Sequence, residues 1–288
     1  MKIRPSKRLA RTECCRHFLA VTENTPPPAA LTIAGADNSA GAGIQADLKT
    51  FTALGAYGLT AVTCVVAEVP GKISAIHPIP APVVTEQIRL SLSAFPVAAI
   101  KTGMLYSTEI VEAVCDLLES STIPLVVDPV MVATSGDTLL RPEAIDLCRR
   151  RLFPRATIVT PNMDEVAVLA GQPIRSLDDM RKAGAALIAQ FGSAWLLKGG
   201  HLAGEEAIDL LFHSDGRVSE FRSPRIQCVS THGTGCTTSA AIAAGLANGL
   251  NLESSVKQAK RFVTAAIRHH HRWGQIHALN HTAWPEPE

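Results

Sequence analysis

Short apolar runs alternate with amphipathic segments along the chain from about residue 30 onward. The apolar runs have the length of buried strands and fall at 30–35, 59–67, 73–79, 98–104, 124–128, 156–160 and 194–198. Apolar residues recur at helical spacing in the segments between and after them, at 43–55, 82–95, 108–120, 142–151, 163–170, 177–191, 236–249 and 253–271. This alternation predicts mainly parallel strands joined by helices that cross over the sheet.

Local signals support several of these boundaries. Ser107 is expected to cap one helix, and Ser176 with Asp179 forms a capping box at the start of another. The pair Asp215-Gly216 separates two short strand-like runs and predicts a hairpin. We therefore expect a three-layer α/β fold, with a mainly parallel central sheet flanked by helices.

Composition allows a sizeable core, since 47% of the 288 residues are hydrophobic and 18% are charged. No change in composition separates two domains after the first segment. We therefore expect one domain at 30–288, preceded by a flexible N-terminal extension at 1–29 that is basic and contains a run of three prolines. That extension has no apolar stretch of the kind that a signal peptide needs.

Charge and cysteine usage narrow the function classes. The net charge is +1, from 27 basic and 26 acidic residues, so electrostatics give no reason to expect nucleic acid or a membrane surface as partner. No run of about 20 apolar residues occurs, which disfavours a membrane span. The seven cysteines are scattered and form no C-x-x-C pair, and this pattern favours a reducing cytoplasm.

Polar or glycine-rich segments follow the predicted strands. They are Gly35-Ala36-Asp37, Glu68, Gly103-Met104, Asp128-Pro129-Val130, TPNMDE (160–165), KGGH (198–201) and a Gly-Thr-Gly loop at 233–235. Each of them alone could be an ordinary turn or a helix cap. Because the carboxyl ends of parallel strands meet at one edge of a sheet, we expect these segments to share one ligand cleft.

The segment THGTGCTTSAAIAAGL (231–246) carries the sharpest signal in the chain. Its glycines let consecutive backbone amides approach an anion, and a following helix adds positive potential at its N-terminus. The order of residues is not that of a Walker A loop. A tight glycine turn that caps a core helix is the structural alternative. Lys198, at the end of an apolar run, needs an anionic partner and fits a phosphate.

These segments together resemble a known family. The stretches LTIAGADNSAGAGIQADLKTFTALGAYG, KTGML, VVDPVM with SGDTLL, TPNMDE, LLKGGH and STHGTGCTTSAAIAAGLA are similar, in this order, to hydroxymethylpyrimidine/phosphomethylpyrimidine kinases of the ribokinase superfamily. The likeness runs from about residue 30 to the end. It implies a ribokinase-like fold and two ATP- and Mg²⁺-dependent phosphorylations, of 4-amino-5-hydroxymethyl-2-methylpyrimidine and then of its monophosphate, for thiamine biosynthesis in the cytoplasm. It also implies a homodimer.

The resemblance assigns roles to individual residues. It implies that the pyrimidine contacts Gly35, Asp47, Glu68, Met104 and Val130. It implies that ATP is held by Asn162, Lys198, Thr231, Gly233, Thr234 and Gly235, and that Asp128 and Glu165 organise magnesium. Cys236 is expected at the hydroxymethyl group, where it shares catalysis with Lys198, Gly233 and Gly235.

One residue departs from the family pattern. Glu68 stands where the family usually has glutamine. A glutamine amide donates and accepts hydrogen bonds, whereas an ionised glutamate only accepts and is costly to bury without a cation. Either Glu68 is protonated, or it meets a protonated ring nitrogen, or the preferred pyrimidine differs.

Cys236 leaves room for other functions. A helix N-terminus favours a thiolate and an adjacent γ-phosphate disfavours it, so we expect Cys236 to be a weak base that orients the hydroxyl and accepts its proton late.

The nearest alternative is a pyridoxal or pyridoxine kinase, or a kinase of a related hydroxymethylpyrimidine. A cysteine hydrolase that uses Cys236 and His232 is a remote alternative, as is a pyrimidine-binding protein without activity.

Overall fold

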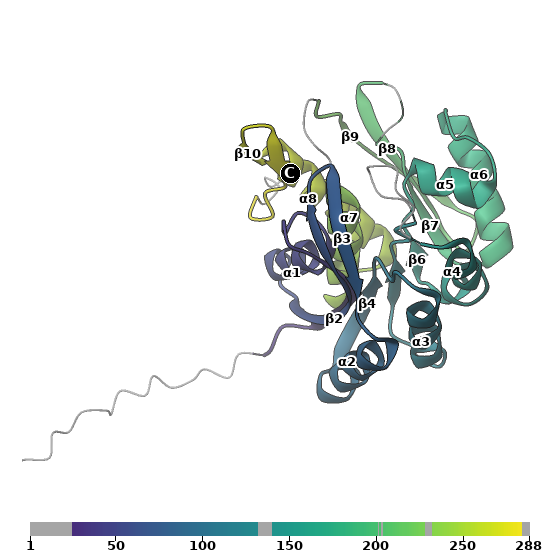
Figure 1. Ribbon diagram of the computed structural model, residues 1–288. Coiled ribbons are helices and arrows are strands. Elements are labelled where there is room, and N and C mark those ends of the chain that lie inside the picture. Colours follow the sequence, from purple (N-terminus) through teal and green to yellow (C-terminus); the bar gives the residue numbers. More distant parts are fainter. Residues whose placement is uncertain (1–24, 132–139, 201, 203, 228–231, 284–288) are drawn as a thin grey trace, which may run out of the picture.

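The computed structural model describes residues 25–131, 140–200, 202, 204–227 and 232–283, and it has a central sheet with helices on both sides (Figure 1). The nine strands of the main sheet are β1 (Ala29–Asp37), β2 (Tyr57–Val69), β3 (Lys72–Pro78), β4 (Val97–Thr102), β5 (Leu125–Val127), β6 (Ile158–Val159), β7 (Ala194–Lys198), β8 (Glu206–Phe212) and β9 (Val218–Pro224). They lie in the order β3-β2-β1-β4-β5-β6-β7-β8-β9. This confirms the expected α/β class.

The centre of the sheet is parallel and its two edges are antiparallel. Strands β2, β1, β4, β5, β6 and β7 run in one direction, each joined to the next in the parallel sense. At one edge β3 pairs with β2 in the antiparallel sense, and at the other edge β8 and β9 form the predicted hairpin. All the carboxyl ends of the central strands therefore meet at one edge of the sheet, where a ligand site is expected.

Two helical layers cover the sheet. The helices are α1 (Gly43–Ala53), α2 (Ala81–Ala94), α3 (Thr108–Leu118), α4 (Pro142–Leu147), α5 (Met163–Ala170), α6 (Leu177–Phe191), α7 (Thr234–Ala247) and α8 (Leu252–Arg268). One buried cluster joins strand residues such as Leu31 and Ile33 to α2, α3, α4, α5 and α6. The other joins Ala30, on the opposite face of the same strand, to α1, α7 and α8. Alternating side chains of β1 thus serve both layers, which is the three-layer arrangement that was predicted.

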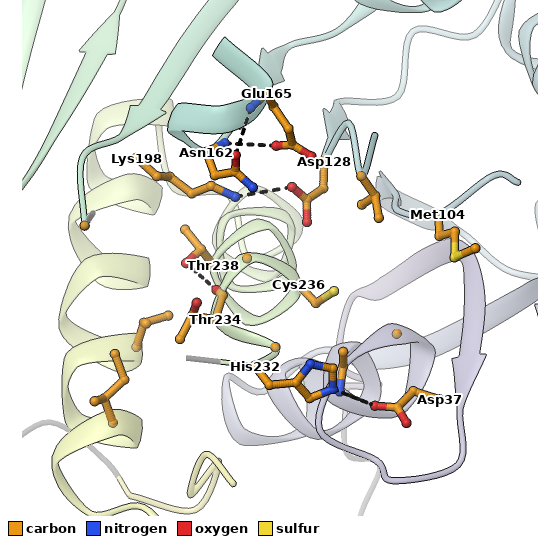
Figure 2. Close-up of a pocket in the computed structure, with 18 of the residues that line it drawn as sticks. Asp37, Met104, Asp128, Asn162, Glu165, Lys198, His232, Thr234, Cys236 and Thr238 are labelled. Carbon is orange, nitrogen blue, oxygen red and sulfur yellow. Dashed lines mark hydrogen bonds and ion pairs between the residues drawn. The ribbon is translucent and has the colours of Figure 1, made fainter. Parts of the chain in front are cut away.

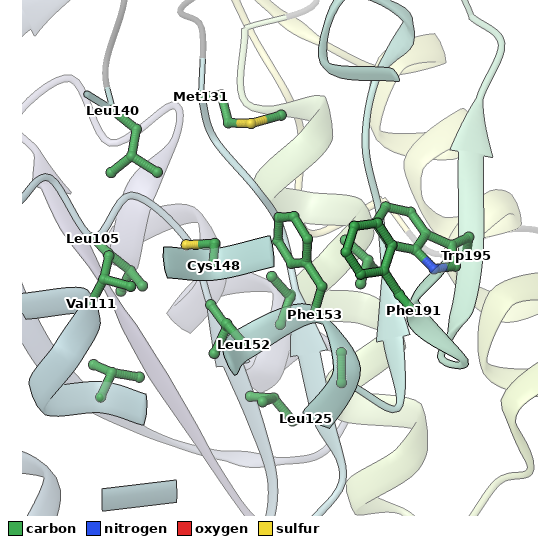
Figure 3. Close-up of a cluster of buried hydrophobic side chains, with 14 of the residues drawn as sticks. Leu105, Val111, Leu125, Met131, Leu140, Cys148, Leu152, Phe153, Phe191 and Trp195 are labelled. Atoms are coloured by element: carbon green, nitrogen blue, oxygen red, sulfur yellow. The ribbon is translucent and has the colours of Figure 1, made fainter. Parts of the chain in front are cut away.

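Aromatic side chains fill the first core where β7 meets α6 (Figure 3). Trp195 is fully buried, and its ring centroid lies 5.6 Å from that of Phe153 and 5.4 Å from that of Phe191. Such tilted and edge-on pairs add about 0.5–1.5 kcal/mol each beyond the area that they bury. This packing fixes β7, the strand that ends at Lys198.

Helix α7 has a different composition because it lies in the middle of the second core. Its residues are mostly small, and ten of its fourteen are buried. A Cβ added at Gly245 would lie only 2.8 Å from the Ser255 Oγ, so glycine there lets α7 and α8 pack closely. The close packing holds the N-terminus of α7 at the edge of the sheet where the parallel strands end.

Several predicted boundaries change in detail. The helix expected at 142–151 ends at Leu147 and continues as one π-helical turn, Cys148–Leu152, and a 3-10 turn, Phe153–Arg155. The last helix ends at Arg268, so His271 belongs to β10 (His271–Trp273), which pairs with β11 (Ile276–Ala278). The expectation of a helix to 271 was wrong, because Gly274 turns the chain back into this small hairpin.

None of the helices in the described ranges is both long and apolar enough to cross a bilayer. Most of the segment expected to be a flexible extension lies outside the described residues, and its assignment stays a prediction. The assignment of 30–288 to one domain stays a prediction as well.

Candidate active site

A cavity of about 330 Å³ opens at the carboxyl edge of the parallel strands (Figure 2). It brings together nearly all the residues that the sequence assigned to a site, from seven separate segments. The predicted residues that line it are Gly35, Glu68, Met104, Asp128, Val130, Asn162, Glu165, Lys198, Gly233, Thr234, Gly235 and Cys236. Thr231 lies outside the described residues, and Asp47 does not line the cavity.

Lys198 and Asp128 form an ion pair at one end of the cavity. The Lys198 ammonium lies 3.3 Å from the Asp128 carboxylate, and Ser239 on α7 donates a hydrogen bond to the other carboxylate oxygen. Burial alone would lower the pKa of Lys198, but the charges of Asp128 and Glu165 raise it above its usual value. The lysine is therefore a permanent cation whose head faces the cavity, as an incoming phosphate requires.

Asn162 and Glu165 are joined in a capping box at the start of α5. The Asn162 side chain accepts from the Glu165 amide, and the Glu165 carboxylate accepts from the Asn162 amide, both at 2.9 Å. The second Glu165 oxygen accepts from the Met131 amide at 3.1 Å. Burial, opposed by the Lys198 charge, raises the pKa of Glu165 to about 7. The sequence suggested a cap at Asn162, but it did not suggest that Glu165 is its reciprocal partner.

The Gly-Thr-Gly loop begins α7 and faces Lys198. Gly233 has a φ of +81°, and a Cβ there would lie 1.8 Å from the Gly41 carbonyl oxygen, so only glycine fits. A Cβ added at Gly235 would lie 3.2 Å from the Lys198 ammonium nitrogen. The first amides of a helix have no acceptor inside it. The loop and Lys198 thus lie together at one end of the cavity, and the sequence predicted that these two segments would meet.

Cys236 follows in the first turn of α7, between the two ends of the cavity (Figure 2). Burial raises the pKa of its thiol to about 11, although the Lys101 ammonium and the Gly43 amide oppose the shift. At pH 7 only about one thiol in 10⁴ would be ionised at such a pKa. The expectation from sequence weighed the effects of the helix N-terminus and of the γ-phosphate on the ionisation of this thiol, but it did not include the effect of burial. A thiol that keeps its proton can orient a hydroxyl group but is a poor base.

Asp47 lies beneath the cavity and not in its wall, contrary to the expectation that it contacts the pyrimidine. Its side chain is fully buried and accepts from the Lys101 ammonium at 2.8 Å and from the Thr32 hydroxyl at 2.6 Å. Burial alone would lower the pKa of Lys101, but the charges of Asp47 and Asp128 raise it above its usual value. Lys101 itself lines the cavity, and sequence reasoning missed it because it lies inside the apolar strand β4.

The other end of the cavity contains two further residues that sequence reasoning left without a role there. His232 donates from its imidazole to the Asp37 carboxylate over 3.2 Å, and both line the cavity. Burial would raise the pKa of Asp37, but hydrogen bonds from His232, Ser39 and nearby amides lower it to about 2. Their positions in the quoted motifs could have indicated this pair, since both adjoin the glycine-rich loops.

The donor set fits magnesium and a nucleotide. Mg²⁺ prefers oxygen ligands and keeps several waters. Asp128 and Glu165 offer only oxygen atoms, each already accepting hydrogen bonds from the protein, so an ion there would be held largely through water and phosphate oxygens. The helix N-terminus and Lys198 fit the phosphates of a nucleotide.

Comparison with known proteins gives a consistent answer. The family model for phosphomethylpyrimidine kinase matches residues 37–281. The chain is 47% identical to the hydroxymethylpyrimidine/phosphomethylpyrimidine kinase of Streptomyces coelicolor over 250 residues, which is 86% of this chain and 91% of that protein. The family match therefore includes every cavity-lining residue of the described chain from Asp37 onward.

Solved structures agree. The phosphomethylpyrimidine kinase of Clostridium difficile superposes with a TM-score of 0.74 at 37% identity, over 83% of this chain and 99% of its own. The pyridoxal kinase of Staphylococcus aureus in complex with AMP-PCP superposes with a TM-score of 0.82 at 36% identity, over 90% of this chain and 94% of its own. The chain is therefore a kinase with the ribokinase-like fold and belongs to the phosphomethylpyrimidine kinase family.

Proposed function

We propose that this kinase phosphorylates 4-amino-5-hydroxymethyl-2-methylpyrimidine and then the resulting monophosphate, as a step of thiamine biosynthesis. One observation carries the proposal: a single cavity has Lys198 and the N-terminus of α7 at one end and Gly35, Met104 and Glu68 at the other. The family of the chain supports the choice of pyrimidine. An anion-binding end and a mixed apolar and polar end suit a phosphate donor and a small heterocycle.

The residue roles follow from this layout. Lys198 and the amides of Thr234 and Gly235 hold the phosphates of ATP, and Asn162 positions Glu165 beside them. Thr231 is proposed as a further ATP contact on the resemblance alone. Asp128 and Glu165 hold Mg²⁺ through oxygen atoms and water. Gly35, Met104 and Val130 contact the ring, and Asp47 supports the site from below through Lys101.

The chemistry needs little covalent help from the protein. The hydroxymethyl oxygen forms a bond to the γ-phosphorus as the bond to the leaving ADP oxygen breaks, and the hydroxyl proton passes late to an oxygen of the transferred phosphoryl group. Such a loose transition state depends on positioning and on neutralisation of charge. Lys198 and the α7 amides supply these. Cys236 orients the hydroxyl group, because its raised pKa leaves it as a thiol.

A pyridoxal kinase activity is the second candidate. The likeness to the Staphylococcus aureus pyridoxal kinase favours it, since that structure superposes over 90% of this chain. Pyridoxal also carries a hydroxymethyl group on an aromatic ring, and Glu68 does not by itself choose between the two rings.

The remaining expectations complete the proposal. ATP is the phosphate donor and Mg²⁺ accompanies it, and the AMP-PCP bound to the related pyridoxal kinase supports nucleotide use. We further propose a homodimer that works in the cytoplasm on small molecules, without a nucleic-acid or membrane partner. The near-zero net charge supports the last point.

Product analysis tests the proposal. The protein is incubated with Mg-ATP and, separately, with the hydroxymethylpyrimidine, its monophosphate, pyridoxine and pyridoxal, and products are followed by mass. We expect the mono- and diphosphate of the pyrimidine, at a kcat/KM at least about tenfold above that for either B6 vitamer, a difference of about 1.4 kcal/mol in transition-state binding. A preference for pyridoxal would replace this proposal with the second candidate.

A further inference from the structure

Glu68 is aimed into the cavity by an irregularity of the sheet. The pairing of β2 with β3 changes register between Ala67 and Glu68. Ala67 lies opposite Ala75, whereas Glu68 lies opposite Ile73, so Ser74 of β3 has no partner on β2. Such bulges redirect a side chain and are common beside active sites. The Glu68 amide also donates to the Asn38 side chain at 2.6 Å, which ties this point of β2 to the loop after β1. The position of the carboxyl group is therefore set by two separate elements.

Glu68 lies beside one further carboxylate and one imidazole. One carboxylate oxygen of Glu68, one of Asp37 and a ring nitrogen of His232 all lie within 4.8 Å of one another. Burial and the Asp37 charge raise the pKa of Glu68, and His232 opposes them. Burial raises the pKa of the Cys64 thiol to about 11, and the Glu68 charge adds to this. Lys72 from β3 lines the same cavity. These are the titratable groups that face Glu68 from the described parts of β1, β2, β3 and the start of α7.

The two carboxylates of this cluster differ in how they are paired. Asp37 Oδ2 accepts from Ser39, Gly41, Ala42 and His232, and Oδ1 accepts from the Ser39 amide. In the described part of the chain, no hydrogen bond reaches the Glu68 carboxylate. Asp37 is thus satisfied by the protein, while the half-buried Glu68, which lines the cavity, has no protein donor among those residues.

A metal ion is a poor occupant for this cluster, although the three residue types could ligate one. Asp37 Oδ2, the oxygen nearest His232, already accepts four hydrogen bonds from the protein. The His232 nitrogen that faces the cluster is the one that bonds Asp37. Binding a metal would break these bonds, so the geometry favours an organic ligand that brings its own N–H groups.

The ligand chemistry follows from the unpaired acid. A carboxylate only accepts hydrogen bonds, and two parallel N–H donors that share a positive charge match it best. In a 4-aminopyrimidine, the exocyclic amine and the adjacent ring nitrogen form such an edge once that nitrogen is protonated. A neutral ring would instead place its nitrogen lone pair against the carboxylate.

We propose that Glu68 is a specificity-determining residue that binds the substrate as an amidinium-like cation, with one proton shared between the carboxyl group and the ring nitrogen. The inference rests on the proposed function and adds to it the charge state of the bound ring. At a pH above the pKa values of both partners, the empty carboxylate and the neutral ring carry no such proton. Binding must then take one up from solution. A glutamine in place of Glu68 donates and accepts as a neutral amide, so it binds the neutral ring with no proton uptake.

The test uses Glu68→Gln in the full chain, with Glu86→Gln on the exposed face of α2 as a matched control. The kcat/KM for the hydroxymethylpyrimidine is measured at saturating Mg-ATP from pH 6 to 9. We expect the wild type and the control to lose up to about tenfold per pH unit at the alkaline end, and Glu68→Gln to stay flat there. Calorimetry of pyrimidine binding in buffers of different ionisation enthalpy should show uptake of about one proton in the wild type and about none in Glu68→Gln.

A second ligand removes the amidine edge itself. The analogue that carries hydrogen in place of the 4-amino group should lose about 100-fold or more in kcat/KM in the wild type and clearly less in Glu68→Gln. Equal pH profiles in the wild type and Glu68→Gln, or no proton uptake in the wild type, would overturn the inference while leaving the kinase activity in place. No phosphorylation of the pyrimidine by the wild type or the control would instead overturn the proposed function.

Discussion

The two ends of the cavity contain similar residue types, but their carboxylates differ in how they are paired. At the phosphate end, the Asp128 carboxylate is neutralised by Lys198 and accepts from Thr160 and Ser239, so every charge has a partner before a ligand arrives. At the ring end, Asp37 is equally well paired, but the carboxylate of Glu68 accepts no hydrogen bond within the described residues. The first end is built for an anion that any ATP-dependent kinase needs. The second end has one carboxylate, that of Glu68, that can accept hydrogen bonds from a particular ring.

This difference separates catalysis from recognition. Charges that are fixed and paired in advance cost no reorganisation during phosphoryl transfer, and this is the condition under which electrostatic stabilisation is most effective. An acid without a partner costs free energy in the empty protein, and the right ligand recovers it. We therefore expect changes at the phosphate end to reduce turnover with every substrate, and changes at the ring end to alter the choice of substrate.

The largest expected effect is a loss of kcat/KM when the phosphate end is changed. Lys198→Ala should lower kcat/KM by about 10⁴-fold, because it removes the cation beside the transferred group and leaves Asp128 without its counter-charge. Cys236→Ala should cost only about 10- to 100-fold, since an un-ionised thiol positions the hydroxyl group without taking its proton. Both variants are measured by ADP release at saturating Mg-ATP, with the surface variant Lys182→Ala on α6 as control.

The ranking of these two variants decides the division of roles. If Cys236→Ala were the more damaging of the two, the thiol would be a true base and the charge-based account of catalysis would be wrong. A rate for Lys198→Ala close to that of Lys182→Ala would remove Lys198 from the phosphate site.

The sequence predicted the phosphate end better than the ring end, for a physical reason. Lys198 and the Gly-Thr-Gly loop lie at the ends of regular elements, so the direction of the strands alone brings them together. Asp47 lies on α1 at a position whose side chain points into the protein, toward Lys101. The spacing of residues along the chain does not predict that this carboxylate pairs with a lysine from the middle of β4. The pair joins a helix to a strand, and the pattern of residues within either element does not say how the helix packs on the sheet.

The second prediction tests that hidden pair beneath the ring end. Lys101→Met keeps the length of the side chain but leaves the Asp47 charge fully buried, so unfolding should become easier by about 3–5 kcal/mol. The double variant Lys101→Met with Asp47→Leu removes both charges and should recover most of this loss. Urea unfolding followed by circular dichroism measures both.

The double variant also serves as the control for simple loss of packing. If it proved as unstable as Lys101→Met alone, burial of an unpaired carboxylate would not be the cause. A loss below about 1 kcal/mol in Lys101→Met would mean that Asp47 is protonated, and that the ion pair contributes little.

The smallest expected effect is a pH dependence of the free energy of unfolding, caused by His232 at the ring end. The hydrogen bond to Asp37 raises the pKa of His232 above its usual value, although burial opposes this. The folded protein therefore holds the imidazolium proton more tightly than the unfolded chain. The extra stability is complete below about pH 6.5, the usual value for histidine, and is lost as the pH rises through the raised pKa. The loss should be about 1 kcal/mol or less, because a neutral imidazole still donates to Asp37.

His232→Gln isolates this effect, with His77→Gln on the exposed face of β3 as the matched control. The free energy of unfolding is compared at pH 5.5 and at pH 8.5 for each protein. The wild type and His77→Gln should lose stability over this interval by nearly the same amount, and His232→Gln should lose less, because a glutamine amide donates to Asp37 equally at both pH values. If all three proteins responded alike, His232 would be neutral throughout. The carboxylates of Asp37 and Glu68 would then have no charged imidazole beside them, and a cationic ring would be bound still more strongly.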